Sequence, residues 1–316
     1  MLSSNMKDVK GLRIRVPATT ANLGAAFDAV GLALKLYLRV EVRRLDGGSS
    51  RLEFEGEGER TVPRDASNLI WRVMEGVAAK CGRPLPPFFL RVQNEIPVTK
   101  GLGSSATACV AAAAAADFLC GLRLEAADIL AIAAAEEGHP DNVAPALYGG
   151  LVASICADRI LCSRSEFPSA WSIIAITPDL ELATKKARAV LPQHVPFADA
   201  VFNVQRSSFL MAQIVQGRRE GVRQAMVDRL HQPYRSALIP GLSEILEIDD
   251  RKGLIGVALS GAGSTVIAFA DSEVEKIGAD LCRIFESHGL SAQVRILKAD
   301  NQGLVMESLN PACQSN

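Results

Sequence analysis

The stretch Ile96-Pro97-Val98-Thr99-Lys100-Gly101-Leu102-Gly103-Ser104-Ser105-Ala106-Thr107 leads directly into the alanine tract Ala111 to Ala116. Glycine tolerates positive φ and lets a bulky anion approach the backbone closely. Serine favours helix starts and alanine favours helix interiors, so we expect Ser104 or Ser105 to cap a stable helix. The free N–H groups and positive end of such a helix attract phosphate. The stretch therefore predicts a phosphate-binding loop that opens a helix, with Lys100 adding a positive charge.

The same stretch is also compatible with a plain Gly-Ser turn before a buried helix, because short glycine-rich matches are weak signals. It is not a Walker A loop, since Lys100 precedes both glycines instead of following the last one, and it does not fit G-x-G-x-x-G either. A nucleotide site at this position must therefore be of another kind.

Length and composition indicate an ordinary globular protein with two domains. The 316 residues exceed the usual size of a single core, so we expect two domains of roughly 150 residues each, at 1–163 and 164–316. With 34 Lys and Arg against 35 Asp and Glu, the net charge of -1 gives no sign of a nucleic-acid partner. The longest apolar runs, such as Cys109 to Ala116, are too short for a membrane span.

The N-terminus and the cysteines indicate the compartment. Residues Met1 to Asp8 lack the apolar core of a signal peptide, so we expect a cytoplasmic protein, whose native start is either Met1 or Met6. Seven cysteines at irregular spacings contain no C-x-x-C pair, which suggests neither a disulfide framework nor a zinc site.

Hydrophobic periodicity predicts alternating groups of strands and helices, which favours the α+β class. Pro17 to Gly24 should form a loop after the first strand, and Ser67 or Asn68 should cap a helix. Strands are predicted at Leu12–Val16, Tyr37–Val42, Leu52–Glu55, Phe88–Val92, Leu151–Ile155, Trp171–Thr177, Ile255–Leu259, Val266–Phe269 and Gln293–Leu297. Helices are predicted from Leu69, through the alanine tract to Gly121, and at Ala126–Glu136, Thr184–Arg188, Ala200–Val215, Gly221–Asp228 and Val274–His288, and a short helix or turn at Asn142–Gly150.

Two groups of polar residues could support chemistry. Glu136 to Asn142 places carboxylates, an imidazole and an amide within seven residues, and a carboxylate beside a triphosphate would hold Mg²⁺. A charged helix end is the alternative. Arg188 and Arg235 could be surface charges, or their forked donors could share one pocket and bind a substrate carboxylate. His194, His231 and His288 receive no role.

Four ordered motifs together resemble those of the GHMP small-molecule kinases. These are Pro17 to Asp28, Gly101 to Ala106, Ser260 to Gly263, and Glu137-Gly138-His139-Pro140-Asp141-Asn142-Val143-Ala144-Pro145, the last being similar to the homoserine kinase branch. The resemblance implies a two-domain GHMP kinase fold, with an N-terminal domain like domain 2 of ribosomal protein S5 and a ferredoxin-like C-terminal domain. Two departures are Ala25-Ala26, where the family usually has Pro-Gly, and Ser264, where it usually has Pro.

The resemblance also implies roles for individual residues. Ser105 and Glu137 would bind Mg²⁺, with Glu136 as the rival, and Asn22 would face the reacting hydroxyl. The substrate ammonium would meet Asp28, and the carboxylate would meet Thr184, Arg188 and Arg235, with His139 and Asp141 lining the same pocket. Gly261 and Gly263 would close the site from the second domain. The residues implied to bind ATP are Asn68, Pro97, Val98, Thr99, Lys100, Gly101, Leu102, Gly103, Ser104, Ser105, Ala106 and Thr107.

The implied activity is ATP-dependent phosphorylation of the side-chain hydroxyl of L-homoserine in threonine biosynthesis, by an enzyme that is usually a homodimer. Related GHMP kinases have an Asp base where this sequence has Asn142, so we expect phosphoryl transfer without a strong side-chain base. Two rival functions are a GHMP kinase for another small alcohol such as mevalonate, and a nucleotide-binding sensor without turnover. The pairing of Asp28 with two arginines favours an amino-acid substrate.

Overall fold

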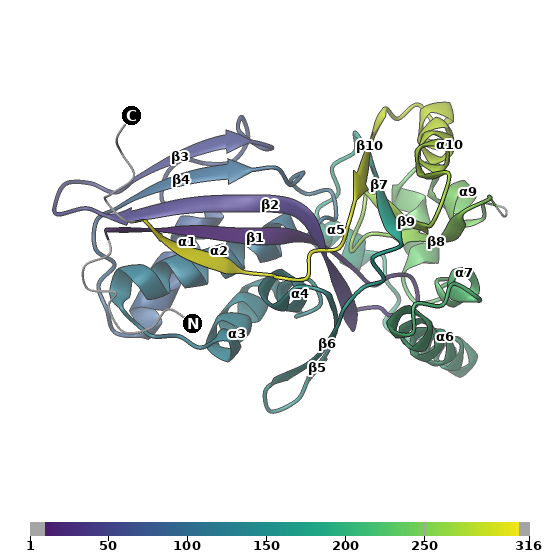
Figure 1. Cartoon of the computed structure of the whole chain (residues 1–316), viewed down its shortest axis with the longest axis horizontal. Coiled ribbons are helices and arrows are strands. Elements are labelled where there is room, and N and C mark those ends of the chain that lie inside the picture. The colour runs from purple at the N-terminus through teal and green to yellow at the C-terminus, as the bar shows by residue number, and fades with distance from the viewer. Residues whose placement is uncertain (1–9, 249–250, 310–316) are drawn as a thin grey trace.

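The computed structural model describes residues 10–248 and 251–309. Two β-sheets stand side by side along the long axis of the molecule, each covered by helices (Figure 1). The two alternative start residues, Met1 and Met6, lie outside the described residues. Within the described residues, no helix is both long enough and apolar enough to cross a membrane.

The first sheet takes strands from both ends of the chain. Its main order is β11-β1-β2-β4-β3, while β5 pairs with β2 and β6 pairs with β5, and only the β3–β4 pair is parallel among the described strands. The strands are β1 (Gly11–Ala21), β2 (Val30–Arg44), β3 (Arg51–Gly56), β4 (Phe88–Asn94), β5 (Leu151–Cys156), β6 (Ile160–Ser165) and β11 (Val305–Leu309).

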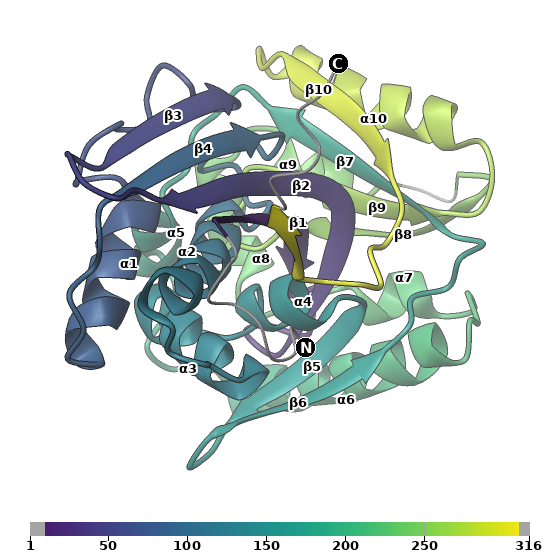
Figure 2. The ribbon, with the colours of Figure 1, turned by 60° about the vertical axis from the view of Figure 1, so that its left-hand side comes forward.

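Strand β1 continues through most of the segment that was predicted to be a loop. The β1–β2 register shifts between Pro17 and Ala18, and β2 curves strongly along its length (Figure 2). A bulge tolerates a proline because it interrupts the hydrogen-bonded ladder, and pairing resumes afterwards as far as Ala21. The loop prediction for residues 17–21 was therefore wrong. The turn begins only at Asn22, where φ is 74°.

Four helices pack on the first sheet: α1 (Leu69–Lys80), α2 (Ser104–Cys120), α3 (Ala126–Glu137) and α4 (Val143–Tyr148). Helix α2 lies between α1 and α3, and every residue from Ala111 to Ala116 is at most 1% exposed. Alanine suits this central position because its small side chain lets neighbouring helices and the sheet approach closely. Gly121 ends α2 with φ 62°, as predicted.

The second sheet is antiparallel, with the order β10-β7-β9-β8. Alternate residues of β7 face opposite sides, so Ile173 joins the core shared with the first domain while Ile174 packs under α10 and α9. The elements are β7 (Ser172–Pro178), α5 (Thr184–Ala189), α6 (Phe197–Val215), α7 (Val222–Ala225), α8 (Gln232–Arg235), η2 (Ser236–Leu238), α9 (Leu242–Leu246), β8 (Leu254–Leu259), β9 (Val266–Ala270), α10 (Val274–Ser287) and β10 (Ala292–Leu297).

The α+β class is confirmed, and most predicted elements are present within a few residues of their expected bounds. The prediction missed β6, α8, α9 and β11. The division into residues 1–163 and 164–316 stays a prediction. Residues 163 and 164 are neighbours inside β6, so the first sheet continues past residue 163. It also includes β11, which pairs with β1 and lies far beyond residue 164 in the sequence.

Candidate active site

Three of the sequence motifs pack against one another through backbone hydrogen bonds. The amide of Thr19 in β1 donates to Leu102 O at 3.1 Å, and the amide of Gly261 donates to Ala21 O at 3.1 Å. The amide of Thr265 donates to Lys100 O at 3.0 Å. The end of β1, the glycine-rich loop and the turn of residues 260–263 therefore form one hydrogen-bonded unit between the two sheets.

Close packing explains the two glycines of the loop. Gly101 has φ 85°, and a Cβ there would lie 2.4 Å from Ser260 O. Gly103 has φ 69°, and a Cβ there would lie 1.9 Å from Thr19 Oγ1. A larger residue at either position would have to displace backbone or a buried side chain.

The predicted capping by serine was wrong at this helix. Gly103 is the N-cap residue of α2, and among the residues that the structure describes no side chain caps the first turn. Gly103, in the left-handed conformation, takes the N-cap position, so Ser104 is already the first residue of the helix, and Ser105 Oγ donates to Glu137. The N–H groups of the first turn are thus left for an anion. At α1 the prediction was correct, since Asn68 Oδ1 accepts from Ile70 N at 2.9 Å.

A cavity of about 540 Å³ lies in front of the N-terminus of α2 and between the two sheets. This volume is typical of small-molecule sites. The predicted site residues that line it are Asn22, Asp28, Asn68, Pro97, Val98, Thr99, Lys100, Gly101, Gly103, Ser104, Ser105, Glu137, His139, Asp141, Thr184, Arg188, Arg235, Gly261 and Gly263.

The side chains of three residues implied to bind ATP do not line this cavity. Leu102, Ala106 and Thr107 are 0% exposed and face the core or β1. Their contribution to a phosphate site would have to come from the backbone. Conversely, the turn of Thr61, Val62 and Pro63 lines the cavity although no sequence motif pointed to it. The turn lies only a few residues before Asn68 in the sequence, which was the one hint that it belongs to the site, and Asn68 Nδ2 donates to Pro63 O at 2.8 Å.

A forked ion pair links the domains at one end of the cavity. Arg188 on α5 donates to both carboxylate oxygens of Asp28, at 3.0 and 2.8 Å. Burial disfavours the charge of Arg188, but the hydrogen bonds and charge of Asp28 outweigh burial and raise the pKa of that guanidinium. The structure thus brings Asp28 from the first domain beside a cation from the second.

Arg235 lies beside this pair and is 1% exposed. Its Nε donates to Ala187 O at 3.2 Å, and its NH1 donates to Gly261 O at 2.9 Å. Burial, together with the nearby charge of Arg188, lowers the pKa of Arg235 to about 10, so Arg235 remains a cation at neutral pH. Of the two arrangements that the sequence left open for Arg188 and Arg235, the structure has the one in which both line the same cavity.

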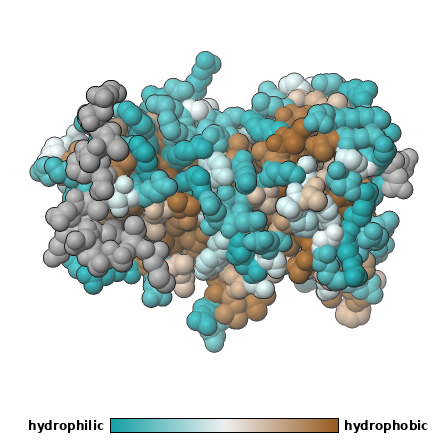
Figure 3. Space-filling model, viewed as in Figure 1, coloured by the Kyte–Doolittle hydropathy of each residue, from teal (hydrophilic) through white to brown (hydrophobic). Residues whose placement is uncertain are grey.

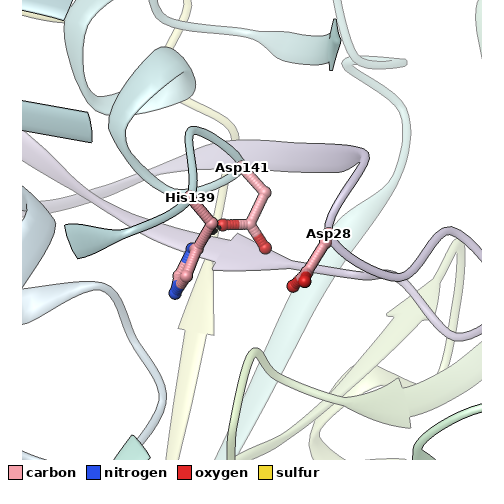
Figure 4. Close-up of side chains that lie close together, drawn as sticks. All are labelled: Asp28, His139 and Asp141. Atoms are coloured by element: carbon pink, nitrogen blue, oxygen red, sulfur yellow. Dashed lines mark hydrogen bonds and ion pairs between the residues drawn. The ribbon is translucent and has the colours of Figure 1, made fainter. Parts of the chain in front are cut away.

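A second acidic residue faces Asp28. His139 Nδ1 lies 2.5 Å from Asp141 Oδ1, and Asn142 N donates to the same oxygen at 2.9 Å. Figure 4 shows the carboxylate of Asp28 pointing toward the space beside His139 and Asp141, and one ligand atom from each lies within 4.8 Å of the others. Since these carboxylates already accept from Arg188, His139 and Asn142, the arrangement suits a bound ammonium group better than a metal ion.

Asn22 holds the turn between these groups. Its Nδ2 donates to Gly261 O at 2.9 Å, and its Oδ1 accepts from Asp28 N at 2.9 Å. Asn142, which stands where related kinases are expected to have an Asp base, accepts at Oδ1 from Thr19 Oγ1 at 2.9 Å. Both amides are therefore fixed in place by the protein at the cavity wall.

Ser105 and Glu137 form the best oxygen pair for a divalent cation. The Ser105 hydroxyl donates to a Glu137 carboxylate oxygen, and both residues line the cavity beside the N-terminus of α2. Glu136 is exposed and is not part of the cavity lining. A hydroxyl and a carboxylate are donors that Mg²⁺ prefers, so these residues fit a Mg²⁺ site.

The ammonium of Lys100 has partners in the second domain. Its Nζ donates to Pro178 O and to Asp179 Oδ1, each at 3.1 Å. A phosphate contact by Lys100 stays a prediction and would compete with these two bonds.

The departures Ala25-Ala26 and Ser264 fit their surroundings. Ala25 and Ala26 are buried, and Ala25 O accepts from Asn203 Nδ2 at 3.0 Å. The hydroxyl of Ser264 donates to Leu180 O, a bond that proline could not make.

Sequence and structure comparisons agree with this architecture. The profile of the GHMP kinases N terminal domain matches residues 68–150, and that of the GHMP kinases C terminal domain matches residues 210–287. The homoserine kinase of Moorella thermoacetica is 42% identical over 294 residues, which cover 93% of this chain and 99% of that protein. The homoserine kinase of Deinococcus radiodurans is 40% identical over 298 residues, covering 93% and 96% respectively.

Solved structures show the same fold. The crystal structure of homoserine kinase from Cytophaga hutchinsonii superposes with a TM-score of 0.84 at 27% identity, covering 97% of this chain and 100% of that one. A mevalonate kinase crystal structure has a TM-score of 0.67 at 14% identity, covering 92% of this chain and 99% of that one, a likeness of fold alone. The chain belongs to the GHMP kinases. Within that superfamily its full-length relatives place it in the homoserine kinase family.

Proposed function

We propose that the protein transfers the terminal phosphoryl group of ATP to the side-chain hydroxyl of L-homoserine, the reaction that leads toward threonine. The observation that supports this substrate is the meeting of Asp28 with Arg188 and Arg235 at one end of the cavity. An amino acid has one charge of each sign, and this end of the cavity offers partners for both.

The substrate fits these groups in one orientation. The ammonium group lies toward Asp28 and Asp141, and the carboxylate lies toward Arg188 and Arg235, with Thr184 at the start of α5 nearby. A guanidinium binds a carboxylate through two parallel donors, whereas Asp28 presents acceptors only. Homoserine therefore exchanges partners with the existing Asp28–Arg188 pair without leaving a buried charge unpaired.

The triphosphate lies at the opposite side of the cavity. The free N–H groups at the start of α2 would donate to phosphate oxygens, and Gly101 and Gly103 let the chain approach them. Ser105 and Glu137 would hold Mg²⁺, which when bound supplies positive charge for the phosphate oxygens. Asn68 and the turn of residues 61–63 border the end of the cavity where adenine would lie.

Phosphoryl transfer in this site depends on alignment. As the homoserine oxygen bonds to the γ-phosphorus, the bond from that phosphorus to its bridging oxygen breaks, and the hydroxyl proton passes to an oxygen of the transferred group. Asn142 has an amide at the position of the base in related kinases, and an amide does not take up a proton at neutral pH. Asn22, Asp28 and the helix N-terminus instead fix the reactants relative to each other.

A coupled assay of ADP release with homoserine, with mevalonate and with no acceptor tests this function. We expect release with homoserine and not with mevalonate, because mevalonate has no ammonium group for Asp28 to bind. Release with mevalonate and not with homoserine would refute the proposed substrate. ATP binding without release in any of the three mixtures would favour the nucleotide sensor.

The assembly and the compartment remain proposals. We propose a cytoplasmic homodimer that binds neither nucleic acid nor membrane. Figure 3 shows apolar side chains among hydrophilic ones, some of them on the projecting β5–β6 hairpin, where Ile155 is 61% exposed. On α6, Phe197 is 84% and Val204 65% exposed. Sedimentation equilibrium of the purified protein tests the dimer, and a mass equal to one chain would refute it.

A further inference from the structure

His231 is a fully buried residue for which the sequence indicated no role. It precedes α8 and is 0% exposed. Asp228 Oδ2 accepts from the backbone amides of His231 and Gln232, at 2.8 and 2.7 Å. These bonds fix the start of the short helix that ends at Arg235.

The two neighbours of the His231 ring define its protonation state. Nε2 lies 2.8 Å from Gly24 O, and Nδ1 lies 3.1 Å from NH1 of Arg235. A carbonyl oxygen only accepts and a guanidinium only donates. The hydrogen is therefore on Nε2, and Nδ1 offers a lone pair to Arg235, so the ring is neutral.

The charged groups around the ring agree with this state. Burial lowers the pKa of His231, and the charge of Arg235 acts in the same direction. Asp228 and Asp28 oppose them, with Asp228 Oδ2 at 3.6 Å from Nε2. A second proton would place an N–H donor against the Arg235 donor.

The surroundings of Arg235 are unusual for a buried cation. Its hydrogen-bond partners are Ala187 O, Gly261 O and His231 Nδ1, all of them neutral. Within residues 10–248 and 251–309, no carboxylate forms an ion pair with it. The carboxylates of Asp28, Asp228 and Asp141 are near enough to favour its charge, but none of them contacts it directly. Buried charges are normally paired in direct contact, so this guanidinium can still take an anion as a direct partner.

An aromatic ring completes this arrangement. The ring of Phe27 stacks on His231 with centroids 4.9 Å apart, and the guanidinium carbon of Arg235 lies 5.3 Å from the Phe27 centroid. Arg188 lies over the same ring at 5.6 Å. The stacked rings of His231 and Phe27 thus both lie beside Arg235 and leave its charge unneutralised.

We propose that His231 is a positioning residue for substrate binding, which as a neutral acceptor orients Arg235 toward the substrate carboxylate while leaving its charge available. This inference rests on the proposed function, because it takes the carboxylate of homoserine as the anion. A carboxylate in place of His231 would also hold Arg235, but it would compete with the substrate for the same donors.

A matched pair of variants separates the two ring nitrogens. In His231→Asn the side-chain oxygen comes close to the position of Nδ1, whereas in His231→Gln the terminal amide comes close to the position of Nε2. We expect the Asn variant to keep its KM for homoserine within about threefold and the Gln variant to raise it about tenfold or more, since hydrogen bonds to charged groups are the stronger ones. The KM for ATP should change in neither. Equal homoserine KM values in both variants, or an equal rise in the ATP KM, would overturn the proposal.

A double-mutant cycle tests whether His231 acts through Arg235. We expect Arg235→Leu to raise the homoserine KM strongly, and His231→Gln to add less than about twofold in that background. If Arg235→Leu leaves the homoserine KM unchanged, the proposed position of the substrate is wrong. If Arg235→Leu raises it but His231→Gln does not, only the role of His231 is wrong.

A measurement on the unmodified protein does not depend on the folding of any variant. Nitrogen-15 NMR of the imidazole rings distinguishes the tautomers, and the chain has only four histidines to assign. At pH 6.5 we expect His231 to be neutral with its proton on Nε2. A charged ring, or a proton on Nδ1, would contradict the proposal.

Discussion

The two carboxylate oxygens of Asp28 lie 3.0 and 2.8 Å from the two terminal nitrogens of Arg188, 160 residues away in sequence. This pair joins the turn after β1 to helix α5 and so connects the two domains at the cavity. Its two members are also the groups that would bind the opposite charges of an amino acid. The protein therefore holds these two recognition groups together by their mutual attraction.

Substitution Asp28→Asn should weaken homoserine binding. Loss of the carboxylate removes the partner of the substrate ammonium and leaves Arg188 without its counter-charge, so we expect the homoserine KM to rise about tenfold to a hundredfold. The ATP KM should stay within about twofold. Steady-state kinetics with each substrate varied measures both. As a control, Asp271→Asn removes the partner of Arg219 outside the cavity lining and should change neither KM.

Glu137 and Glu136 provide a matched test of the metal site. We expect Glu137→Gln to raise the Mg²⁺ concentration for half-maximal activity at least about tenfold, because the carboxylate beside Ser105 is lost. Glu136→Gln removes an exposed carboxylate and should have little effect. Activity is measured across a Mg²⁺ titration at saturating ATP. Similar shifts in the two variants would contradict the assignment to Glu137.

Lys100 can serve either the phosphates or the contact between domains. If its ammonium moves to the triphosphate, Lys100→Met should raise the ATP KM about tenfold, since a charge-assisted bond is lost. Asp179→Asn, which releases Lys100 from its carboxylate partner, should then leave the ATP KM unchanged or lower it. Kinetics with ATP varied at saturating homoserine tests both variants. An unchanged ATP KM in Lys100→Met would limit Lys100 to the domain contact.

The His139–Asp141 pair should make stability depend on pH. Burial opposes the charge of His139, but the hydrogen bond and charge of Asp141 prevail and raise the pKa of the imidazole above 6.5. Because the pKa of His139 is higher in the folded protein than in the unfolded chain, where it is about 6.5, protonation favours the folded state. This stabilisation is fully present below pH 6.5 and is lost as the pH rises through the folded-state pKa. We therefore expect His139→Gln to lower the free energy of unfolding by on the order of 1 kcal/mol more at pH 6 than at pH 9.

Urea unfolding at the two pH values measures this difference. His194→Gln, at an exposed position, is the control, and it should change the free energy of unfolding little at either pH. A loss of stability in His139→Gln that is larger at pH 9 would contradict the direction of the pKa change.

Much of the site could be predicted because its residues belong to short sequence motifs whose backbone conformation is determined by neighbouring residues. Gly101 and Gly103 need positive φ and lie against Ser260 O and Thr19 Oγ1, so glycine at these positions was an interpretable signal. Residues 137–142 start at the last residue of α3 and reach the cavity as one segment. The convergence of Arg188 and Arg235 could be considered from the sequence but not established, since it depends on how α5 and α8 pack across the second domain.

The features that the sequence did not reveal depend on distant contacts. Ser104 was a reasonable N-cap by propensity, yet Gly103 in its left-handed conformation takes that position and Ser104 lies inside the helix. His231 received no role from the sequence, because the atoms that define its tautomer belong to Gly24 and to Arg235. Strand β11 is a short stretch of mixed polarity whose only structural signal is the partner strand β1, nearly 300 residues earlier.

The position of β11 also bears on how the protein is made. Strand β1 pairs with β2 on one side and with β11 on the other, from Gly11↔Leu309 to Arg15↔Val305. During translation, one edge of β1 stays open until residue 309 has left the ribosome, long after the rest of its sheet has been synthesised. Pairs so far apart in sequence form slowly, and an open edge invites pairing with other chains. The first sheet therefore begins with β1 and is complete only when β11, the last of the described strands, pairs with it.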